Sequence, residues 1–310
     1  MHIADVFAAH KATFSFEFFP PKDEQGWEGL FAAIRELEPL RPHYVSVTYG
    51  AGGSSREETH RLVERLKTET TLDPIPHLTC VCHSAEDIRL ILERYAAVGV
   101  SNIMALGGDP PRWMSDYRKQ DDHFQHAADL VRFIRAFDAS QFNPNFRGRG
   151  FGIGVAGFPE GHPATPHRVL EMDYLKAKVD AGADYICTQL FFDNRDFYDF
   201  RDRCELAGIR VPIVAGLMPI TSAGTFKRLP ELALGARYPA KLTKRITKHG
   251  EDNAAIRQVG IDWATQQARD LLENNVAGIH FYTLNRSTAT IEIFRRLGAD
   301  NVGQLEQYVV

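Results

Sequence analysis

The sequence predicts an α/β fold, a single (β/α)8 TIM barrel over residues 1–310 with an extra helix before the last strand. Three observations lead to this prediction. Short runs rich in Val, Ile, Phe and Tyr alternate with longer amphipathic stretches from end to end. There are eight such runs, which is the strand count of this barrel. No low-complexity or Gly-, Ser- and Pro-rich linker separates them. A doubly wound open sheet is the alternative, but it would use six of the runs and leave the rest over.

The strands are predicted from their β-branched and aromatic content, and the helices from apolar residues at three- and four-residue steps. The predicted strands are residues 13–18, 43–48, 75–81, 101–106, 151–156, 184–190, 212–217 and 277–283. The predicted helices are residues 27–38, 56–68, 85–98, 123–137, 166–181, 195–207, 222–234, 252–273 and 288–297, of which 252–273 is the extra one. Ser84 and Asp87 have the spacing of a capping box at the start of the third helix.

The composition is that of a globular protein, with 44% hydrophobic and 25% charged residues. A net charge of −4 gives no reason to expect nucleic acid or an anionic membrane as a partner. The basic run at 237–248 is interpreted as a solvated face or loop. Four cysteines are too few for a disulfide scaffold and indicate a reducing compartment. Without a membrane-length apolar run or a signal peptide, the sequence predicts a cytoplasmic protein.

A barrel of this kind builds its active site from the carboxyl ends of the strands and the loops that follow them. The first predicted strand ends in SFEFFPP (15–21), where one carboxylate lies among three phenylalanines. Side-chain alternation places Phe14, Phe16 and Phe18 on one face of this strand and Glu17 on the other. We therefore expect the phenylalanines to face the helices and Glu17 to point into the barrel mouth.

Gly152, Gly154 and Gly157 have the G-x-G-x-x-G spacing of a dinucleotide-binding turn. The motif requires a strand before it and a helix opening on it, but these glycines fall inside a predicted strand. The residues that follow, FPEGHP, cannot open a helix promptly. We expect the three glycines to relieve crowding within a barrel strand instead.

The stretch HLTCVCH (77–83) has residue types that bind zinc. Strand alternation places His77 and Thr79 on one face and Cys80 and Cys82 on the other, which separates the potential ligands. The sequence therefore predicts no metal site here, although His77 alone could point at a bound ligand.

Four strand-end segments carry groups whose roles their residues leave open: VTYGAGGSSREE (47–58), ALGGDPP (105–111), TQLFFDN (188–194) and YTLNRS (282–287). The first is either a backbone site for a ligand such as phosphate or a plain turn. Asp109 in the second is either a rigid carboxylate at the barrel mouth or a turn cap. Gln189 either reads a heterocyclic edge or carboxamide or caps a helix. Arg286 either captures an anion or is solvated.

In their order along the chain, these segments resemble the methylenetetrahydrofolate reductase family. The motifs SFEFFPPK, SVTYGAGGSSRE, PHLTC, LGGDPP, FPEGHP, AGADYICTQLFFD and FYTLNRS lie between residues 13 and 297, and the first, the last and TQLFFD are the most specific. The resemblance implies a (β/α)8 barrel that carries FAD and accepts electrons from NADH or NADPH. The flavin then reduces 5,10-methylenetetrahydrofolate to 5-methyltetrahydrofolate in a ping-pong reaction, which supplies one-carbon units for methionine synthesis.

The resemblance also implies roles for individual residues. Glu17 matches the general acid, and Asp109 matches an aspartate near both flavin and pterin. Gln189 matches a glutamine that contacts whichever of nicotinamide or folate occupies a shared site, while Tyr282 and Arg286 match the folate side of the mouth. The implied FAD contacts are Thr48, Tyr49, His77, Gly107, Gly108, Asp109, His126, Ala127, Phe158, His162, Glu171 and Lys178, with Glu160 in the same segments.

Two positions depart from the family's pattern. Gly107 stands where the family often has arginine, so one FAD contact would be lost or replaced, and Phe158 stands where a tyrosine is frequent. The resemblance implies a homo-oligomer, a dimer or tetramer, with small-molecule substrates as its partners. It does not choose between NADH and NADPH, although the absence of an appended regulatory domain favours a bacterial-type, NADH-using enzyme.

The implied reaction sets the demands on the two carboxylates. Protonation of the substrate at N10 opens its methylene bridge to a 5-iminium cation, which accepts hydride from the reduced flavin. Partial burial among phenylalanines would favour the protonated form of Glu17, and Asp109 in its glycine turn would stay ionised and stabilise the cation. The rivals are a pterin-binding methyltransferase, which would need a corrinoid or metal partner, and a flavin- or folate-binding protein without turnover, which has no use for an acid at Glu17.

Overall fold

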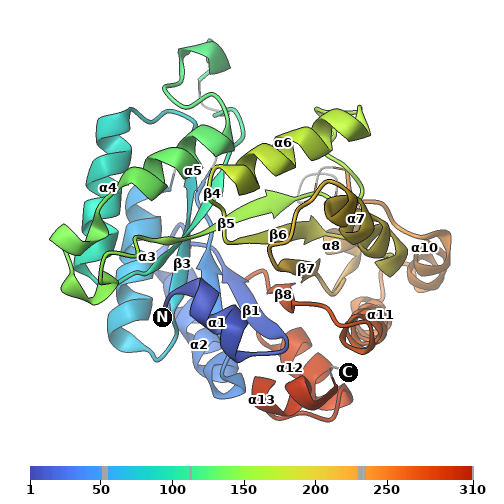
Figure 1. Cartoon of the computed structure of the whole chain (residues 1–310). Coiled ribbons are helices and arrows are strands. Elements are labelled where there is room, and N and C mark those ends of the chain that lie inside the picture. The colour runs from blue at the N-terminus through green and yellow to red at the C-terminus, as the bar shows by residue number, and fades with distance from the viewer. Residues whose placement is uncertain (51–54, 112–113, 230–232, 234, 309–310) are drawn as a thin grey trace.

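The computed structural model has the predicted architecture: eight parallel strands close into a barrel in the order β1 to β8, surrounded by helices (Figure 1). It describes residues 1–50, 55–111, 114–229, 233 and 235–308. All eight predicted strands are confirmed, each end within two residues of its expected position. They are β1 (Thr13–Phe18), β2 (Tyr44–Val47), β3 (Pro74–Thr79), β4 (Asn102–Leu106), β5 (Gly152–Gly157), β6 (Tyr185–Leu190), β7 (Ile213–Leu217) and β8 (Gly278–Tyr282).

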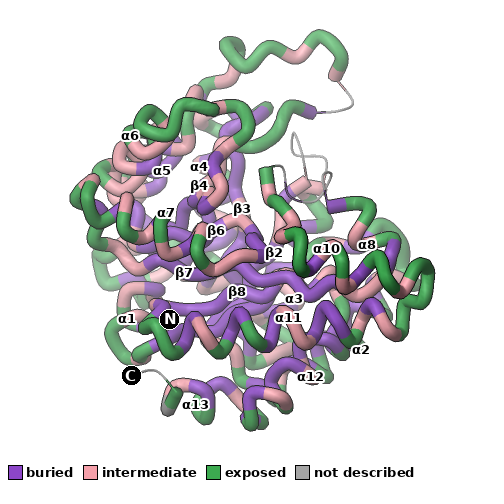
Figure 2. The backbone as a smooth tube through the Cα atoms, turned by 90° about the vertical axis from the view of Figure 1, so that its right-hand side faces the viewer, coloured by how far each residue is buried: buried purple, intermediate pink, exposed green. Residues whose placement is uncertain are grey.

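Most of the helices that follow the strands have a buried and an exposed side (Figure 2), and the buried residues are largely apolar; α6 is an exception, since it buries only Leu175. They are α2 (Glu24–Leu37), α3 (Arg56–Glu69), α4 (Ala85–Ala97), α5 (Ala127–Ala136), α6 (Arg168–Asp180), α7 (Asn194–Leu206), α8 (Ala223–Lys227), α10 (Ala240–Thr247), α11 (Asn253–Glu273), α12 (Thr288–Arg296) and α13 (Val302–Leu305). The capping box predicted at Ser84 and Asp87 is present at the start of α4. Within the described residues, no helix is both long and apolar enough to cross a membrane.

The segment between β7 and β8 carries three described helices. α11 packs against both α12 and α7, so it closes the ring of helices around the barrel. The helix predicted as the extra one, residues 252–273, is thus α11 and belongs to the ring, and the additional elements before the last strand are α8 and α10. The helix predicted at 222–234 begins as α8, and residues 230–232 and 234 lie outside the described residues. α10 carries most of the predicted basic run: it buries Leu242 and Ile246 and exposes its lysines, as a solvated face should, whereas Arg237 before it is ion-paired with Glu160 and Asp196.

A short helix, α1 (Ile3–Ala9), closes the amino-terminal end of the barrel and is absent from the sequence prediction. Ile3 and Val6 are buried in a cluster with barrel residues such as Tyr185. The Asn102 side chain fixes α1 in place, because it accepts a hydrogen bond from Ile3 N and donates one to Met1 O, both at 2.7 Å. Seven residues contain too few apolar positions to reveal a helical period, so packing decides this helix.

The glycines of β5 relieve crowding, as predicted. A Cβ atom at Gly154 would lie 2.5 Å from the ring of Tyr185, and one at Gly152 would lie 2.3 Å from Asn102 Oδ1. The dinucleotide-binding interpretation is thereby excluded structurally, since the strand continues through all three glycines of the motif.

Gly154→Ala should lower the free energy of unfolding by about 1–3 kcal/mol, because the fully buried Tyr185 ring would have to shift in a packed interior. Denaturant titration of the purified variant would measure this loss. Gly29→Ala is the matched control: a Cβ there meets no described atom within 4 Å on an exposed turn of α2. It should raise stability by about 0.5–1 kcal/mol through helix propensity. Equal effects of the two substitutions would contradict the packing role of Gly154.

Candidate active site

Glu17 points into the barrel at its carboxyl-terminal mouth, as strand alternation predicts. The ring of Phe16 faces outward and packs edge-on against Phe294 of α12, with ring centroids 6.1 Å apart. The Glu17 side chain is 18% exposed, and its Oε2 lies 3.8 Å from Nε2 of both His77 and His280. The expectation that phenylalanines enclose this carboxylate is wrong, because they lie on the other face of β1. Two imidazoles flank it instead.

His280 is absent from the predicted site. Its ring is buried beneath Glu17, with Nδ1 2.7 Å from Ser15 Oγ and Nε2 3.3 Å from Ser46 Oγ. These contacts join β8, β1 and β2 under the mouth. Alternation along the last strand would have placed His280 and Tyr282 on the same inner face, which is the signal that could have found it.

His77 also faces the barrel interior, whereas Cys80 packs in the core outside the barrel. Cys80 and Cys82 both lie beyond the end of β3, and Cys82 is exposed, so strand alternation does not place them as predicted. Burial lowers the pKa of His77 to about 4; His280 adds to the shift and Glu17 opposes it. The ring is therefore neutral at neutral pH. It can exchange a hydrogen bond with Glu17 but does not form a stable ion pair with it.

Gln189 is half-buried at the carboxyl end of β6. Its Oε1 accepts a hydrogen bond from the Leu190 N–H at 2.9 Å, whereas its NH2 group has no hydrogen-bond partner among the described residues. Tyr282 lies across the mouth with its ring 5.0 Å from that of His280, and its hydroxyl donates to Thr188 O at 2.9 Å. The donor side of Gln189 therefore remains free for a ligand, while the Tyr282 hydroxyl is engaged within the barrel.

The loop after β8 is tied to the loop after β1. The Asn285 side chain accepts from Phe19 N at 3.0 Å and donates to Phe19 O at 2.8 Å. Thr283 Oγ1 donates to Glu17 O at 2.6 Å. These contacts were not predicted; they hold the exposed Arg286 on the same side of the mouth as Glu17.

The loop after β4 contains Gly107, Gly108 and the exposed Asp109. Gly108 has φ +81°, and a Cβ there would lie 2.9 Å from both Thr79 Cβ and Val81 Cγ2, so only glycine fits. A Cβ at Gly107 meets no described atom within 4 Å. The space for a longer side chain is thus present at this position, although the sequence does not use it.

A second group of predicted residues gathers where β5 meets α6. The His162 N–H donates to Glu171 Oε1 at 2.8 Å, and the rings of Phe158 and His162 lie edge-on at 4.7 Å. Lys178 Nζ donates to Ala156 O at 2.6 Å. Burial lowers the Lys178 pKa to about 8, opposed by Glu171, and burial also lowers the His162 pKa. Glu171, His162 and Lys178 form a half-buried polar wall beside β5 that a ligand can use.

Glu160 anchors loops to one another. Its Oε1 accepts from Arg237 N at 2.9 Å and from Arg237 Nε at 3.0 Å, and Arg237 also pairs with Asp196 at 3.1 Å. Burial raises the pKa of Glu160, and the contacts to Arg237 oppose the shift. Arg237 lies in the segment before α10, so this link joins the loop after β5 to the segment between β7 and β8.

The remaining predicted contacts lie near the same end of the barrel. Thr48 O, at the end of β2, accepts from Thr59 Oγ1 at 3.0 Å. Tyr49 is buried with its hydroxyl 2.9 Å from His83 Nε2, so it supports the loop from inside. His126 and Ala127 begin α5, and the His126 ring stacks on exposed Tyr174 of α6 at 6.0 Å. Residues 51–54 and 112–113 of the predicted site segments lie outside the described residues.

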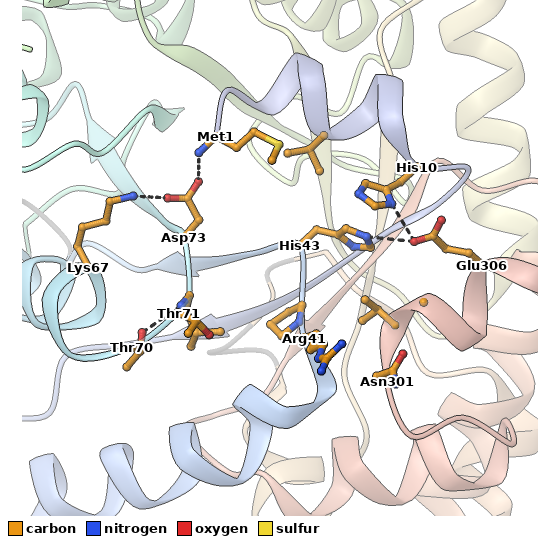
Figure 3. Close-up of a pocket in the computed structure, with 15 residues that line it drawn as sticks. Met1, His10, Arg41, His43, Lys67, Thr70, Thr71, Asp73, Asn301 and Glu306 are labelled. Carbon is orange, nitrogen blue, oxygen red and sulfur yellow. Dashed lines mark hydrogen bonds and ion pairs between the residues drawn. The ribbon is translucent and has the colours of Figure 1, made fainter. Parts of the chain in front are cut away.

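A separate pocket of about 580 Å³ lies at the opposite end of the barrel, below α1 (Figure 3). His10 Nδ1 and His43 Nε2 approach the same oxygen of Glu306, at 2.9 and 3.2 Å. Among the described residues, these form the one group of three His, Cys, Asp or Glu side chains with the spacing of metal ligands.

Hydrogen bonding argues against a metal in this group. His43 Nδ1 accepts the Phe14 N–H at 2.9 Å, so a neutral His43 carries its proton on Nε2 and directs it at Glu306. A metal at Nε2 would require the proton on Nδ1, facing the Phe14 N–H donor. We therefore interpret the group as a hydrogen-bonded junction of the segments that carry His10, His43 and Glu306.

Comparison with known proteins supports the resemblance seen in the motifs. A sequence model of the family described as methylenetetrahydrofolate reductase matches residues 2–298. The 5,10-methylenetetrahydrofolate reductase of Pectobacterium carotovorum is 37% identical over 286 residues, which cover 92% of this chain and 89% of that protein. The Escherichia coli protein of the same name is 34% identical over 284 residues, covering 92% of this chain and 90% of its own.

Methylenetetrahydrofolate reductase (NADH) 1 of Arabidopsis thaliana is 37% identical over 305 residues, which cover 96% of this chain but 50% of that protein. The chain thus spans about half the length of the plant and yeast relatives that it matches. Among solved structures, one neighbour is an uncharacterized protein from Clostridium thermocellum that binds two copies of 5-methyl-5,6,7,8-tetrahydrofolic acid. Its TM-score is 0.65 at 13% sequence identity, and the match covers 94% of this chain and 96% of that protein, which shows a shared fold. Because the family model matches nearly the whole length of this chain, the chain belongs to the methylenetetrahydrofolate reductase family.

Proposed function

We propose that this protein is an FAD-dependent enzyme that reduces 5,10-methylenetetrahydrofolate to 5-methyltetrahydrofolate with NADH or NADPH, in a ping-pong reaction. Membership of the family supports the activity. One observation supports placing this reaction at the barrel mouth: the Glu17 carboxyl group points into the mouth between two imidazoles. A protein that only binds its ligand has no use for an acid at that position.

The residues near β5 suit a flavin nucleotide. Lys178 and His162 offer polar contacts beside the half-buried Glu171. On α6, the exposed apolar side chains of Val169, Leu170 and Tyr174 offer a surface on which a flat ring system can pack. The open space at Gly107 leaves room for a ligand near the loop after β4. On these grounds, Lys178, His162, Glu171 and the loop at 107–109 would hold FAD.

When bound, FAD would accept a hydride from the nicotinamide and deliver it to the folate. Glu17 would give its proton to N10 of the folate as the bond between N10 and the methylene carbon breaks, and the hydride would add to that carbon. Asp109 would stabilise the iminium cation that precedes hydride addition. The free N–H donors of Gln189 would bind acceptor atoms of nicotinamide and pterin in turn.

Titration of the purified protein with FAD tests the cofactor proposal directly. We expect saturable quenching of flavin fluorescence and a perturbed visible spectrum. NADH or NADPH should then bleach that spectrum, and methylenetetrahydrofolate should restore it. If the protein binds FAD but methylenetetrahydrofolate does not restore the oxidised flavin spectrum, it is a flavoprotein with another substrate. If it binds no flavin, the whole proposal is contradicted.

Several finer points belong to the same proposal. Plant relatives are named for NADH, which favours NADH as the donor, and rates with the two nucleotides would decide this. We also propose a homo-oligomer, a dimer or tetramer, in the cytoplasm, whose product supplies methyl groups for methionine synthesis. Light scattering of the purified protein would test the oligomeric state.

A further inference from the structure

The pairing of β6 with β7 contains an irregularity beside Gln189. Cys187 lies opposite Val214, and Leu190 lies opposite Gly216. Between these pairs the chain advances three residues along β6 but two along β7, which is the mismatch of a β-bulge. Bulges occur next to active sites, where they redirect a side chain. Here the side chains that the bulge redirects are those of the two residues between the pairs, Thr188 and Gln189.

Contacts from two other strands hold this bulge. Thr188 is fully buried, and its Oγ1 accepts the Gly216 N–H of β7 at 2.9 Å. The carbonyl oxygen of Thr188 accepts the Tyr282 hydroxyl of β8 at 2.9 Å. Gly216 permits the close approach, because a Cβ there would lie 2.5 Å from Thr188 O and 2.8 Å from the Tyr282 ring. Three neighbouring strands thus interlock around one residue.

The bulge leaves Gln189 in a defined hydrogen-bonding state. Its Oε1 accepts from the next backbone N–H, that of Leu190, which occupies one of the two lone pairs of the amide oxygen. The two N–H donors stay free within the described part of the chain. Gln189 can therefore donate to hydrogen-bond acceptors of a ligand. A carboxamide oxygen and a pterin carbonyl both present such an atom.

We propose that Thr188 and Tyr282 are positioning residues that hold the β6 bulge and so fix Gln189 as a donor for both ligands of the active site. This inference rests on the proposed function, in which Gln189 contacts nicotinamide and pterin in turn. It also assigns Tyr282 a role within the barrel, through its hydroxyl, in addition to its place at the folate side of the mouth.

Thr188→Val tests the proposal, because it keeps the side-chain shape and removes the acceptor of the Gly216 N–H. We expect the KM for both the nicotinamide nucleotide and the folate to rise about 10-fold with a smaller change in kcat, the size expected for one misplaced hydrogen bond. Thr188→Ser should restore both KM values. Tyr282→Phe, which removes the bond to Thr188 O, should raise both KM values in the same direction.

Thr290→Val is the matched control. Thr290 is also a fully buried threonine, on α12, but its hydroxyl makes no hydrogen bond within the described residues. The same substitution there should leave both KM values unchanged. Comparable KM increases in the two valine variants would overturn the proposal, since they would reflect general loosening of the barrel.

A double-mutant cycle separates action through Gln189 from independent effects. In a Gln189→Ala background, Thr188→Val should cause no further rise in either KM. A further 10-fold rise would show that Thr188 acts independently of Gln189 and would overturn the inference. If Gln189→Ala alone leaves both KM values unchanged while the enzyme turns over, the positioning role fails and the proposed reaction stands.

The rate of amide hydrogen exchange at Gly216 can be measured whether or not the enzyme turns over. Thr188→Val should accelerate exchange of this amide, and Thr188→Ser should not. Unchanged exchange in Thr188→Val would overturn the bulge-holding role, even for a protein that showed no turnover. Absence of turnover in the unmodified protein, with exchange at Gly216 responding as expected, would contradict the proposed function and leave the structural part of the inference intact.

Discussion

Glu17→Gln is expected to abolish folate reduction while leaving reduction of the flavin by NADH or NADPH largely intact. The amide keeps the size of the side chain but has no proton of sufficient acidity to give to N10. General acids of this kind contribute about 10²- to 10⁴-fold to rate, so the second half-reaction should slow by that factor. Hydride transfer from the nicotinamide requires no acid, and its rate should change by only a few fold.

Stopped-flow measurement of the two half-reactions separates these effects. Each half-reaction is followed by flavin absorbance, first after mixing with nucleotide and then, for the reduced enzyme, after mixing with folate. Glu28→Gln provides the matched control, because Glu28 is an exposed carboxylate on α2, outside the barrel. Equal loss in both half-reactions of Glu17→Gln would indicate damage to the site as a whole and would refute the role of Glu17 as acid.

Acid should destabilise the folded protein as the pH falls below 6.5, because buried histidines must then take up protons. Burial lowers the pKa of His60 to about 4, and burial likewise lowers that of His77 to about 4. His60 lies on the buried face of α3, with Nδ1 2.8 Å from the hydroxyl of Tyr95 on α4. Both imidazoles are neutral in the folded state at neutral pH, whereas in the unfolded chain they protonate near pH 6.5.

The sign follows from these two pKa values. The unfolded chain binds protons that the folded state excludes, so stability is complete above pH 6.5 and is lost as the pH falls from 6.5 towards 4. At pH 5 each histidine should cost about 2 kcal/mol, together about 4 kcal/mol relative to pH 7. That is a large share of the typical stability of a domain.

Denaturant midpoints at pH 7 and pH 5 would measure this loss. His60→Gln should remove about 2 kcal/mol of this loss, whatever it does to stability at pH 7. His123→Gln should leave the pH dependence unchanged, because His123 is exposed. A free energy of unfolding that is flat between pH 7 and pH 5 would contradict the neutral, buried state of His60 and His77.

Much of the fold could be predicted from local patterns. The period of two in β1 placed Glu17 inward and its phenylalanines outward before any partner was known. The glycines of β5 were assigned to crowding because no helix could open after them, and the Tyr185 ring over Gly154 confirms it. α1 was not predicted because a helix of seven residues is too short to show a helical period. The position of α11 in the ring of helices depends on its contacts with α7 and α12, which the sequence does not show.

The position of the candidate site residues along the strands could be predicted, but their contacts could be predicted less well. The strand-end residues that the motifs selected lie around one end of the barrel, but the side chains of several of them form hydrogen bonds within the protein. Tyr49 is bonded to His83, Glu160 to Arg237, and Tyr282 to Thr188. Those partners come from other loops and strands, so no short pattern contains them.

By itself, the sequence determined the eight-stranded barrel, the inward direction of Glu17 and the strand ends at which the candidate ligand-binding groups lie. These follow from periods of two and of 3.6 residues, which depend only on backbone geometry within one element. Only the tertiary structure decided that His280, 263 residues away along the chain, lies 3.8 Å from Glu17, and that the N–H donors of Gln189, beside a bulge in β6, have no partner among the described residues. The register between strands and the closure of the barrel set those distances, and register is a property of pairs of strands that neither strand encodes alone.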